Sequence, residues 1–289
     1  MTPLNDLDFE PAPASEPSAT PLDQDGHLRG SRLVNAAVAV LVACLAVGAW
    51  YWWSSDGNPA VPATAAGTDG TEATVGRAEP LGTAAPVDLP PLDALDPFLR
   101  SMLQGLSARP ELAGLLATDN LLRRFVVSVE NIGRGATPVR QLSGVRVEGQ
   151  FSVEQQNAPS TISTATFARY DALAATVSEI DPTALATIYG QLRPRLNEAY
   201  AELGAGTSFD AAMERAIVHL LSVSPDLGRG QVVRPVKGVS YAWATSETEN
   251  LSSAQKQLLR MGPDNARGVQ AALRDLALAL GIPAERLPK

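Results

Sequence analysis

The sequence predicts a mainly α-helical protein: one membrane-spanning helix, a disordered linker, and a globular domain of about six to eight helices with one or two small β-hairpins. Three observations lead to this prediction. Residues 33–53 form an apolar run without a charged side chain. Residues 54–87 are rich in Pro, Ala, Gly and Thr. Across residues 88–289, apolar side chains recur at helical spacing between capping and stop signals.

The apolar run 33–53 is long enough to cross a bilayer. At about 1.5 Å per residue it spans roughly 30 Å, the thickness of the hydrocarbon core. Arg29 and Arg32 precede it, and no Lys or Arg follows until Arg77. This asymmetry predicts a bacterial inner-membrane protein with a cytoplasmic N-terminus and a periplasmic C-terminal domain. The run ends in side chains typical of the membrane–water boundary: Trp50, Tyr51, Trp52 and Trp53.

The run has two other interpretations. A cleaved signal peptide fits poorly, because the run is long and no small-x-small cleavage site follows it before the linker. Residues 41–44 resemble a lipobox ending at Cys44, but the residues that follow are apolar, whereas mature lipoproteins usually begin with polar residues. In the transmembrane interpretation Cys44 is a small apolar helix residue. Whether Cys44 is lipidated stays open.

Most of the chain's formal net charge of -8 belongs to the tail and the linker. Residues 1–32 carry six acids and two bases and are predicted to be disordered, because they have little to bury. Residues 54–87 carry four acids and one base and are predicted to form a flexible linker. Residues 88–289 carry 21 acids and 20 bases, a balance that argues against a nucleic-acid-binding domain.

The first helices of the domain are predicted from capping residues and apolar stripes. Asp96 is expected to cap a helix that runs to about residue 106, and residues 111–117 form a second, short helix. Thr118 or Asp119 is expected to cap a third helix. Its apolar stripe consists of Leu121, Leu122, Phe125, Val126, Val129 and Ile132.

A loop and small β-hairpins interrupt the helices. Residues 134–148 are predicted to be a loop. Residues 151–153 and 161–162 are expected to pair as one hairpin, and residues 232–233 and 239–243 as another. Further helices are predicted at 165–180, from Asp181 to about 203 with Pro194 inside, at 210–222, from Ser252 or Ser253 to the stop at Gly262-Pro263, and at 264–280.

Several longer blocks of the domain carry a family resemblance. They are DPFLR (96–100), TDNLLRRFVVSVENIGRG (118–135), FARYDALAATVSEIDP (167–182), LRPRLNEAYAELG (192–204), FDAAMERAIVHLL (209–221) and LSSAQKQLLRMGPDNARGVQAALRDL (251–276). Together they resemble the bacterial family called domain of unknown function 3014. The resemblance implies a membrane-anchored envelope protein of proteobacteria. It brings no activity and no functional residues to this chain.

The candidate binding group is a set of five arginines on one helix and the loop after it. A guanidinium can hold a carboxylate or an anionic polymer through two parallel hydrogen bonds, and no acid occurs between Glu130 and Glu148. The alternative is structural: Arg123 pairs with Asp119 at i,i+4, and the loop arginines are solvated. The set consists of Arg123, Arg124, Arg134, Arg140 and Arg146.

Carboxylate catalysis is the main chemical alternative. Asp119 and Glu130 are separated by about 16 Å of helical rise, beyond the roughly 5–9.5 Å between the paired carboxyls of glycosidases. Glu130 would therefore need a partner from another element, such as Asp171 or Glu214. The sequence alone does not pair them.

Two further candidates have simpler explanations. His219 falls beside the apolar stripe of its helix and is expected to be a boundary residue rather than a ligand. Tyr241 and Trp243 alternate on a predicted strand. They fit either a carbohydrate-stacking platform or a packing role, in which one contacts the helices and the other lines the open face.

These features favour a non-catalytic, membrane-tethered periplasmic domain that binds or organises envelope components. The expected partners are the inner membrane and an envelope protein or anionic envelope polymer, not nucleic acid. The alternative is an envelope enzyme that hydrolyses a glycan or peptide with carboxylates. The sequence contains no cofactor motif, and two histidines exclude a His-rich metal site.

Overall fold

The computed structural model describes residues 80–82, 84–85, 87–138, 141, 147, 149–154, 159–205, 208–233 and 241–289. The expected tail 1–32, membrane span 33–53 and most of the linker 54–87 lie outside these ranges. So do the boundary residues Arg29, Arg32, Trp50, Tyr51, Trp52 and Trp53. Within the described ranges, no helix is both long and apolar enough to cross a membrane.

The described residues confirm the mainly helical prediction for the domain. Among them are eight α-helices of seven residues or more, together with shorter helices and strands. The longer helices are α3 (Leu95–Leu103), α4 (Pro110–Leu116), α5 (Leu121–Gly133), α7 (Asp171–Ser178), α8 (Pro182–Ala201), α9 (Phe209–Leu221), α11 (Ser253–Arg260) and α12 (Pro263–Ala279). The shorter ones are α6 (Thr164–Ala168), α10 (Ser246–Glu249) and the 3₁₀ turns η2 (Leu92–Ala94), η4 (Pro225–Arg229) and η5 (Ala284–Arg286).

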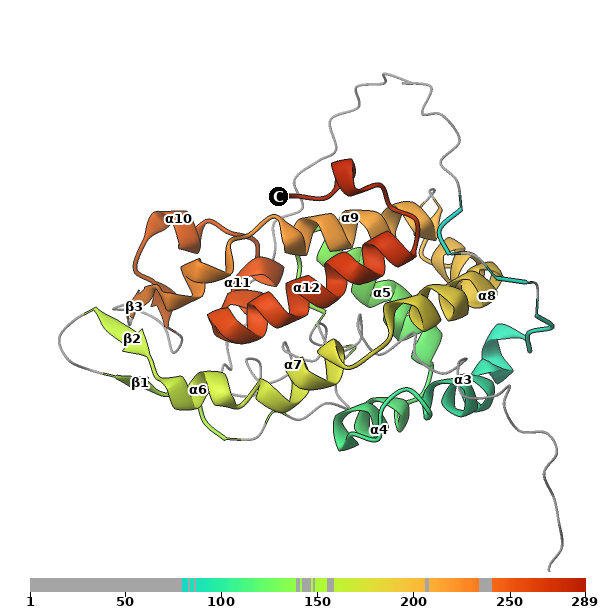
Figure 1. The fold of residues 1–289 in the computed structure, drawn as a ribbon, viewed down its shortest axis with the longest axis horizontal. Coiled ribbons are helices and arrows are strands. Elements are labelled where there is room, and N and C mark those ends of the chain that lie inside the picture. The colour runs from blue at the N-terminus through green and yellow to red at the C-terminus, as the bar shows by residue number, and fades with distance from the viewer. Residues whose placement is uncertain are drawn as a thin grey trace, which may run out of the picture. The chain divides into compact units, whose positions relative to one another are not determined.

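Helices α5, α8, α9 and α12 build the centre of the domain (Figure 1). Helix α5 packs against α8 and α9, while α12 packs against α7, α8 and α9. Most of the apolar stripe predicted on α5 is buried, and Val126 and Val129 are completely inaccessible. These side chains recur at 3.6-residue spacing because one face of α5 lies in the core, as predicted.

Two predicted helix starts are confirmed in atomic detail. The Asp181 side chain accepts a hydrogen bond from the Thr183 amide, and Pro182 occupies the first turn of α8. At α11 the cap is Ser252: its hydroxyl accepts from the Gln255 amide, and the Gln255 side chain accepts from the Ser252 amide. This reciprocal capping box satisfies two donors at the helix start.

The single helix expected at residues 165–180 is wrong, because the chain breaks between α6 and α7. The Tyr170 amide bonds to the Phe167 carbonyl, which closes a tight turn. The Asn265 side chain donates to the same carbonyl at 3.1 Å and to the Asp171 carboxylate at 2.9 Å. A residue at the start of α12 thus fixes the junction at which α7 begins.

The predicted hairpins occur, and they join into one antiparallel sheet with strand order β1-β2-β3-β4. Strand β2 (Ser160–Ile162) pairs with β1 (Val153–Glu154) on one side and with β3 (Gln231–Val233) on the other. Strand β3 then pairs with β4 (Ala242–Trp243). Pairing between β2 and β3 connects segments about seventy residues apart in sequence, which local patterns do not reveal.

The packed part of the chain begins before the expected domain boundary at residue 88. Leu81 is buried, and its amide donates to Asp210 on α9 at 3.3 Å. The Gly82 amide donates to the carbonyl of Leu280 at 2.9 Å. From α8, Arg193 donates to the Leu81 carbonyl. The end of the linker is therefore attached to helices α8, α9 and α12 rather than hanging free.

Candidate functional site

Arg123 is held in ion pairs within the domain. Its guanidinium lies 2.7 Å from Glu202, just after α8, and 2.8 Å from Asp93 in η2. The hydrogen bond from Arg123 lowers the pKa of the Glu202 carboxyl below its ordinary value. The expected alternative partner, Asp119, pairs instead with Arg100 at 3.1 Å. Arg123 thus links α5 to two other elements.

The other members of the arginine set have different surroundings. Arg124 donates to the carbonyl of Gln141 at 2.9 Å, which ties part of the following loop to α5. Arg134, just beyond the end of α5, reaches back to Glu130. Arg140 and Arg146 lie outside the described residues. Binding of an anionic partner by this set stays a prediction.

Glu130 is the centre of a polar cluster between α5, α8 and α9. Its carboxylate is almost fully buried, with only 10% of the side chain exposed. One oxygen lies 2.5 Å from Nε of Arg134. The other accepts from Nη2 of Arg215 at 2.7 Å and from the hydroxyl of Tyr200 at 2.9 Å. These donors supply the pairing that a buried carboxylate needs.

An aromatic cluster lies next to this carboxylate and includes Tyr200, which donates to it. The Phe209 ring, which is completely buried, contacts Tyr200 and Phe125 edge-on, at centroid distances of 5.6 and 5.7 Å. Tyr189 stacks on it at 6.2 Å and donates its hydroxyl to Asp210. Burial, together with the neighbouring Asp210, raises the pKa of Tyr189 above its ordinary value, so the hydroxyl keeps its proton.

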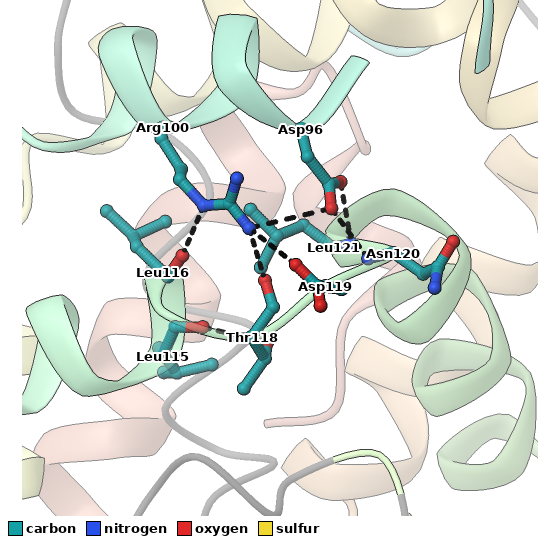
Figure 2. A network of polar contacts seen from close by, with 8 residues as sticks. All are labelled: Asp96, Arg100, Leu115, Leu116, Thr118, Asp119, Asn120 and Leu121. Atoms are coloured by element: carbon teal, nitrogen blue, oxygen red, sulfur yellow. Dashed lines mark hydrogen bonds and ion pairs between the residues drawn. The ribbon is translucent and has the colours of Figure 1, made fainter. Parts of the chain in front are cut away.

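Asp119 belongs to a second polar network, which joins α3, α4 and α5 (Figure 2). Arg100 on α3 donates to the carbonyls of Leu116 and Thr118 at the end of α4, at 2.8 and 2.9 Å. It also contacts the Asp119 carboxylate. The guanidinium therefore caps the C-terminus of α4, where free carbonyls favour a cation.

The cap of α5 comes from another helix, so the expectation of Thr118 or Asp119 at that position is wrong. Asp96 of α3 accepts from the amides of Asn120 and Leu121 at 2.7 and 3.0 Å (Figure 2). Asn120 itself adopts a left-handed conformation with φ of 57° and makes no side-chain cap. Asp96 was expected to cap α3, but α3 begins one residue earlier, at Leu95.

The remaining carboxylates proposed for catalysis also have partners. Asp171 accepts from Asn265 at 2.9 Å, and Glu214 pairs with Arg286 at 2.6 Å. Neither is the partner of Glu130. Its partners are Arg215 from α9 and Tyr200 from α8. The structure therefore brings Glu130 together with cations and a hydroxyl rather than with a second acid.

His219 is only partly buried, which agrees with its predicted position beside the apolar stripe of α9. Its Nε2 is 2.7 Å from the Ser252 hydroxyl, the same group that caps α11. Gln255 donates to the His219 carbonyl, which secures the contact between α9 and α11 from the other side. Burial lowers the pKa of His219 below its ordinary value, so the ring is neutral at pH 7.

The two aromatic residues near β4 have different positions. Trp243 is buried, whereas Tyr241 is only partly buried and packs against Phe151 at a centroid distance of 5.5 Å. This arrangement matches the packing interpretation for Trp243. Among the residues that the structure describes, no group of three or more His, Cys, Asp or Glu side chains is placed to hold a metal ion.

Arg215 is the site residue that the sequence did not single out. Arg215 lies on α9 and is itself exposed, but its guanidinium reaches Glu130 on α5. Gly133 is a local signal for this contact, because a Cβ there would lie 3.0 Å from Nε of Arg215. The absence of a side chain at the end of α5 leaves room for the guanidinium to reach Glu130.

Fold and site together define a mainly helical domain whose charged side chains link its helices. The sequence model of the family "Protein of unknown function (DUF3014)" matches residues 121–277, more than half of the chain. The chain belongs to this family. No curated protein and no solved structure gives a match.

Proposed function

We propose that the protein is a membrane-tethered binding or scaffolding domain of the bacterial envelope. The apolar run 33–53 would anchor it in the inner membrane, and Arg29 and Arg32 would keep its N-terminus in the cytoplasm. The helical domain would then lie in the periplasm and bind an envelope protein or an anionic envelope polymer. The membrane part of the proposal rests on the apolar run 33–53 and the arginines before it. The binding part rests on the side-chain contacts of the domain.

The observation that carries the binding part is the engagement of the candidate catalytic carboxylates. Asp119 and Glu214 are each paired with an arginine, and Asp171 accepts from an amide. Glu130 is held by two arginines and a tyrosine. Hydrolysis by paired carboxylates needs two acids placed on either side of the scissile bond, whereas each of these four carboxylates contacts a donor of the domain itself. The arrangement therefore favours binding over hydrolysis.

The test uses spheroplasts that carry the full chain and a membrane-impermeant, amine-reactive crosslinker. The three lysines of the chain, Lys237, Lys256 and Lys289, all follow residue 88. We expect a discrete crosslinked species that contains the chain and one partner, because only a periplasmic domain meets the reagent. The control is a chimera in which residues 1–79 carry an unrelated periplasmic domain of similar size.

The two parts of the proposal fail separately. If the full chain reacts only after the cells are lysed, the proposed orientation is wrong. If it reacts in spheroplasts but gives only the species that the chimera gives, the domain itself contributes no binding. Mass spectrometry of the crosslinked bands distinguishes these results.

A further inference from the structure

The cluster on Glu130 differs from the other ion pairs of the described residues in its charge balance. Arg134 and Arg215 share the single acid Glu130. Other ion pairs of the described residues are balanced or rich in acid: Arg109 pairs with Glu179, and Arg123 pairs with both Asp93 and Glu202. Arg229 and Arg267 share Asp226 and Asp264.

Each guanidinium contacts a different oxygen of the same carboxylate, so the two cations share one counter-charge. The contacts are 2.5 Å for Arg134 and 2.7 Å for Arg215. Both side chains also reach the surface, with exposed fractions of 68% and 41%. Each guanidinium has five N–H donors, and the carboxylate uses only part of them. The cluster thus combines two partly exposed cations with a single buried acid.

Contacts with neighbouring elements fix the position of the cluster. Glu130 is buried and fixed by Tyr200, so the anchoring carboxylate cannot swing away to follow a mobile arginine. Gly135 follows Arg134, and its carbonyl accepts hydrogen bonds from the Ala254 amide and the Ser253 hydroxyl, which fixes the backbone next to Arg134. Arginines that are already ordered lose less conformational entropy when they bind a ligand.

We propose that Arg134 and Arg215 form an oxyanion-binding site that receives a phosphate or carboxylate group of the partner. An oxyanion placed over the two guanidiniums would accept charge-assisted hydrogen bonds and neutralise the excess charge of the cluster. The proposal deepens the proposed binding function and rests on it for the biological role of the site. It adds Arg215, from a different helix, to the arginine set.

The experiment measures binding of tripolyphosphate and of citrate to the full chain in phosphatidylcholine nanodiscs by isothermal titration calorimetry. The variant R134Q/R215Q should weaken the affinity for at least one of these probes about tenfold or more, because it removes several hydrogen bonds between charged groups. The matched control is R229Q/R267Q. It removes the same charge from side chains that are 62% and 44% exposed but balanced by two acids, and it should change the affinity less than about twofold.

A second variant guards against a misfolded site. R134Q/R215Q leaves the buried carboxylate of Glu130 without its cations, which can destabilise the domain. E130Q/R134Q/R215Q removes that unpaired charge as well. It should bind the probe as weakly as R134Q/R215Q does, but its melting temperature should lie closer to that of the wild type. Loss of affinity in both variants, with an intact fold in the second, supports the site.

A competition experiment distinguishes a lipid headgroup from a soluble anion as the natural ligand. Nanodiscs with phosphatidylglycerol in place of phosphatidylcholine should compete with tripolyphosphate if the natural ligand is a lipid headgroup, and should not compete if it is a soluble anion. Absence of binding, or equal losses in the R134Q/R215Q and R229Q/R267Q variants, would overturn the proposal. Arginine-dependent binding without a crosslinked partner in spheroplasts would retain the site and reject the proposed function.

Discussion

Replacement of Gly262 by alanine is expected to destabilise the domain by about 3–5 kcal/mol, through backbone strain and a steric clash together. Gly262 links α11 to α12 with φ of 89° and ψ of 157°, a conformation that is essentially restricted to glycine. A Cβ at this position would lie 2.5 Å from Cγ of Phe167 and 2.8 Å from its Cβ. Chemical denaturation of the wild type and the variant measures the difference.

Two control variants separate the strain from the clash. Gly281→Ala introduces a side chain at φ of 91° where no heavy atom lies within 4 Å, so it should cost only about 1 kcal/mol. Adding Phe167→Ala to Gly262→Ala should recover part of the lost stability, because the obstructing ring is gone. Equal effects of Gly262→Ala and Gly281→Ala would show that the contact with Phe167 is unimportant.

Replacement of Phe209 by alanine should cost about 3–5 kcal/mol, the usual range for a buried phenylalanine. Its ring is 0% exposed and lies between Phe125, Tyr189 and Tyr200. Loss of the ring leaves a cavity in the core and removes the support of Tyr200, which donates to Glu130. The free energy of unfolding, again from chemical denaturation, is the quantity to compare.

Phe209→Leu is the matched control, because it keeps an apolar side chain in the same space. It should destabilise less than Phe209→Ala. A loss below about 1 kcal/mol for Phe209→Ala would contradict the central position given to this ring, since surface substitutions typically stay within about 0.5 kcal/mol.

Helix positions followed from the sequence wherever the determinant was local. The stripe on α5 identified the buried face of that helix, and Val126 and Val129 are completely buried. Ser252 at the start of α11 and Gly262 at its end were recognised because capping boxes and glycine stops are short-range patterns. The same reasoning succeeded at Asp181-Pro182, where α8 begins.

Local patterns failed where a distant residue determines the structure. Asp96 caps α5 from α3, twenty-four residues before Asn120, so the nearby acid Asp119 was given the wrong role. Asn265 fixes the break between α6 and α7 from the start of α12. Neither interaction changes the composition or the spacing of the segment on which it acts, so neither leaves a signal there.

In the candidate site, too, the residue with a local signal could be predicted and the residue brought in by long-range packing could not. Arg134 was identified because arginines are dense and acids absent between Glu130 and Glu148. Arg215 was not, because its importance comes from the packing of α9 against α5 and from a carboxylate that both helices share. Helical spacing predicts the contact between Glu130 and Arg134, which are four residues apart. It does not predict the contact with Arg215, because that residue lies on α9.

The central claim is that this domain binds a partner through the surface around Arg134 and Arg215, and site-specific photocrosslinking in cells tests it most directly. A photoreactive amino acid replaces Ala136, an exposed residue two positions after Arg134, in the full chain. The control position is Leu278 on α12, which is 47% exposed. We predict a covalent adduct from position 136 that disappears when R134Q/R215Q is added, and no adduct from position 278. No adduct at 136, or an equal yield at 278, would contradict the account.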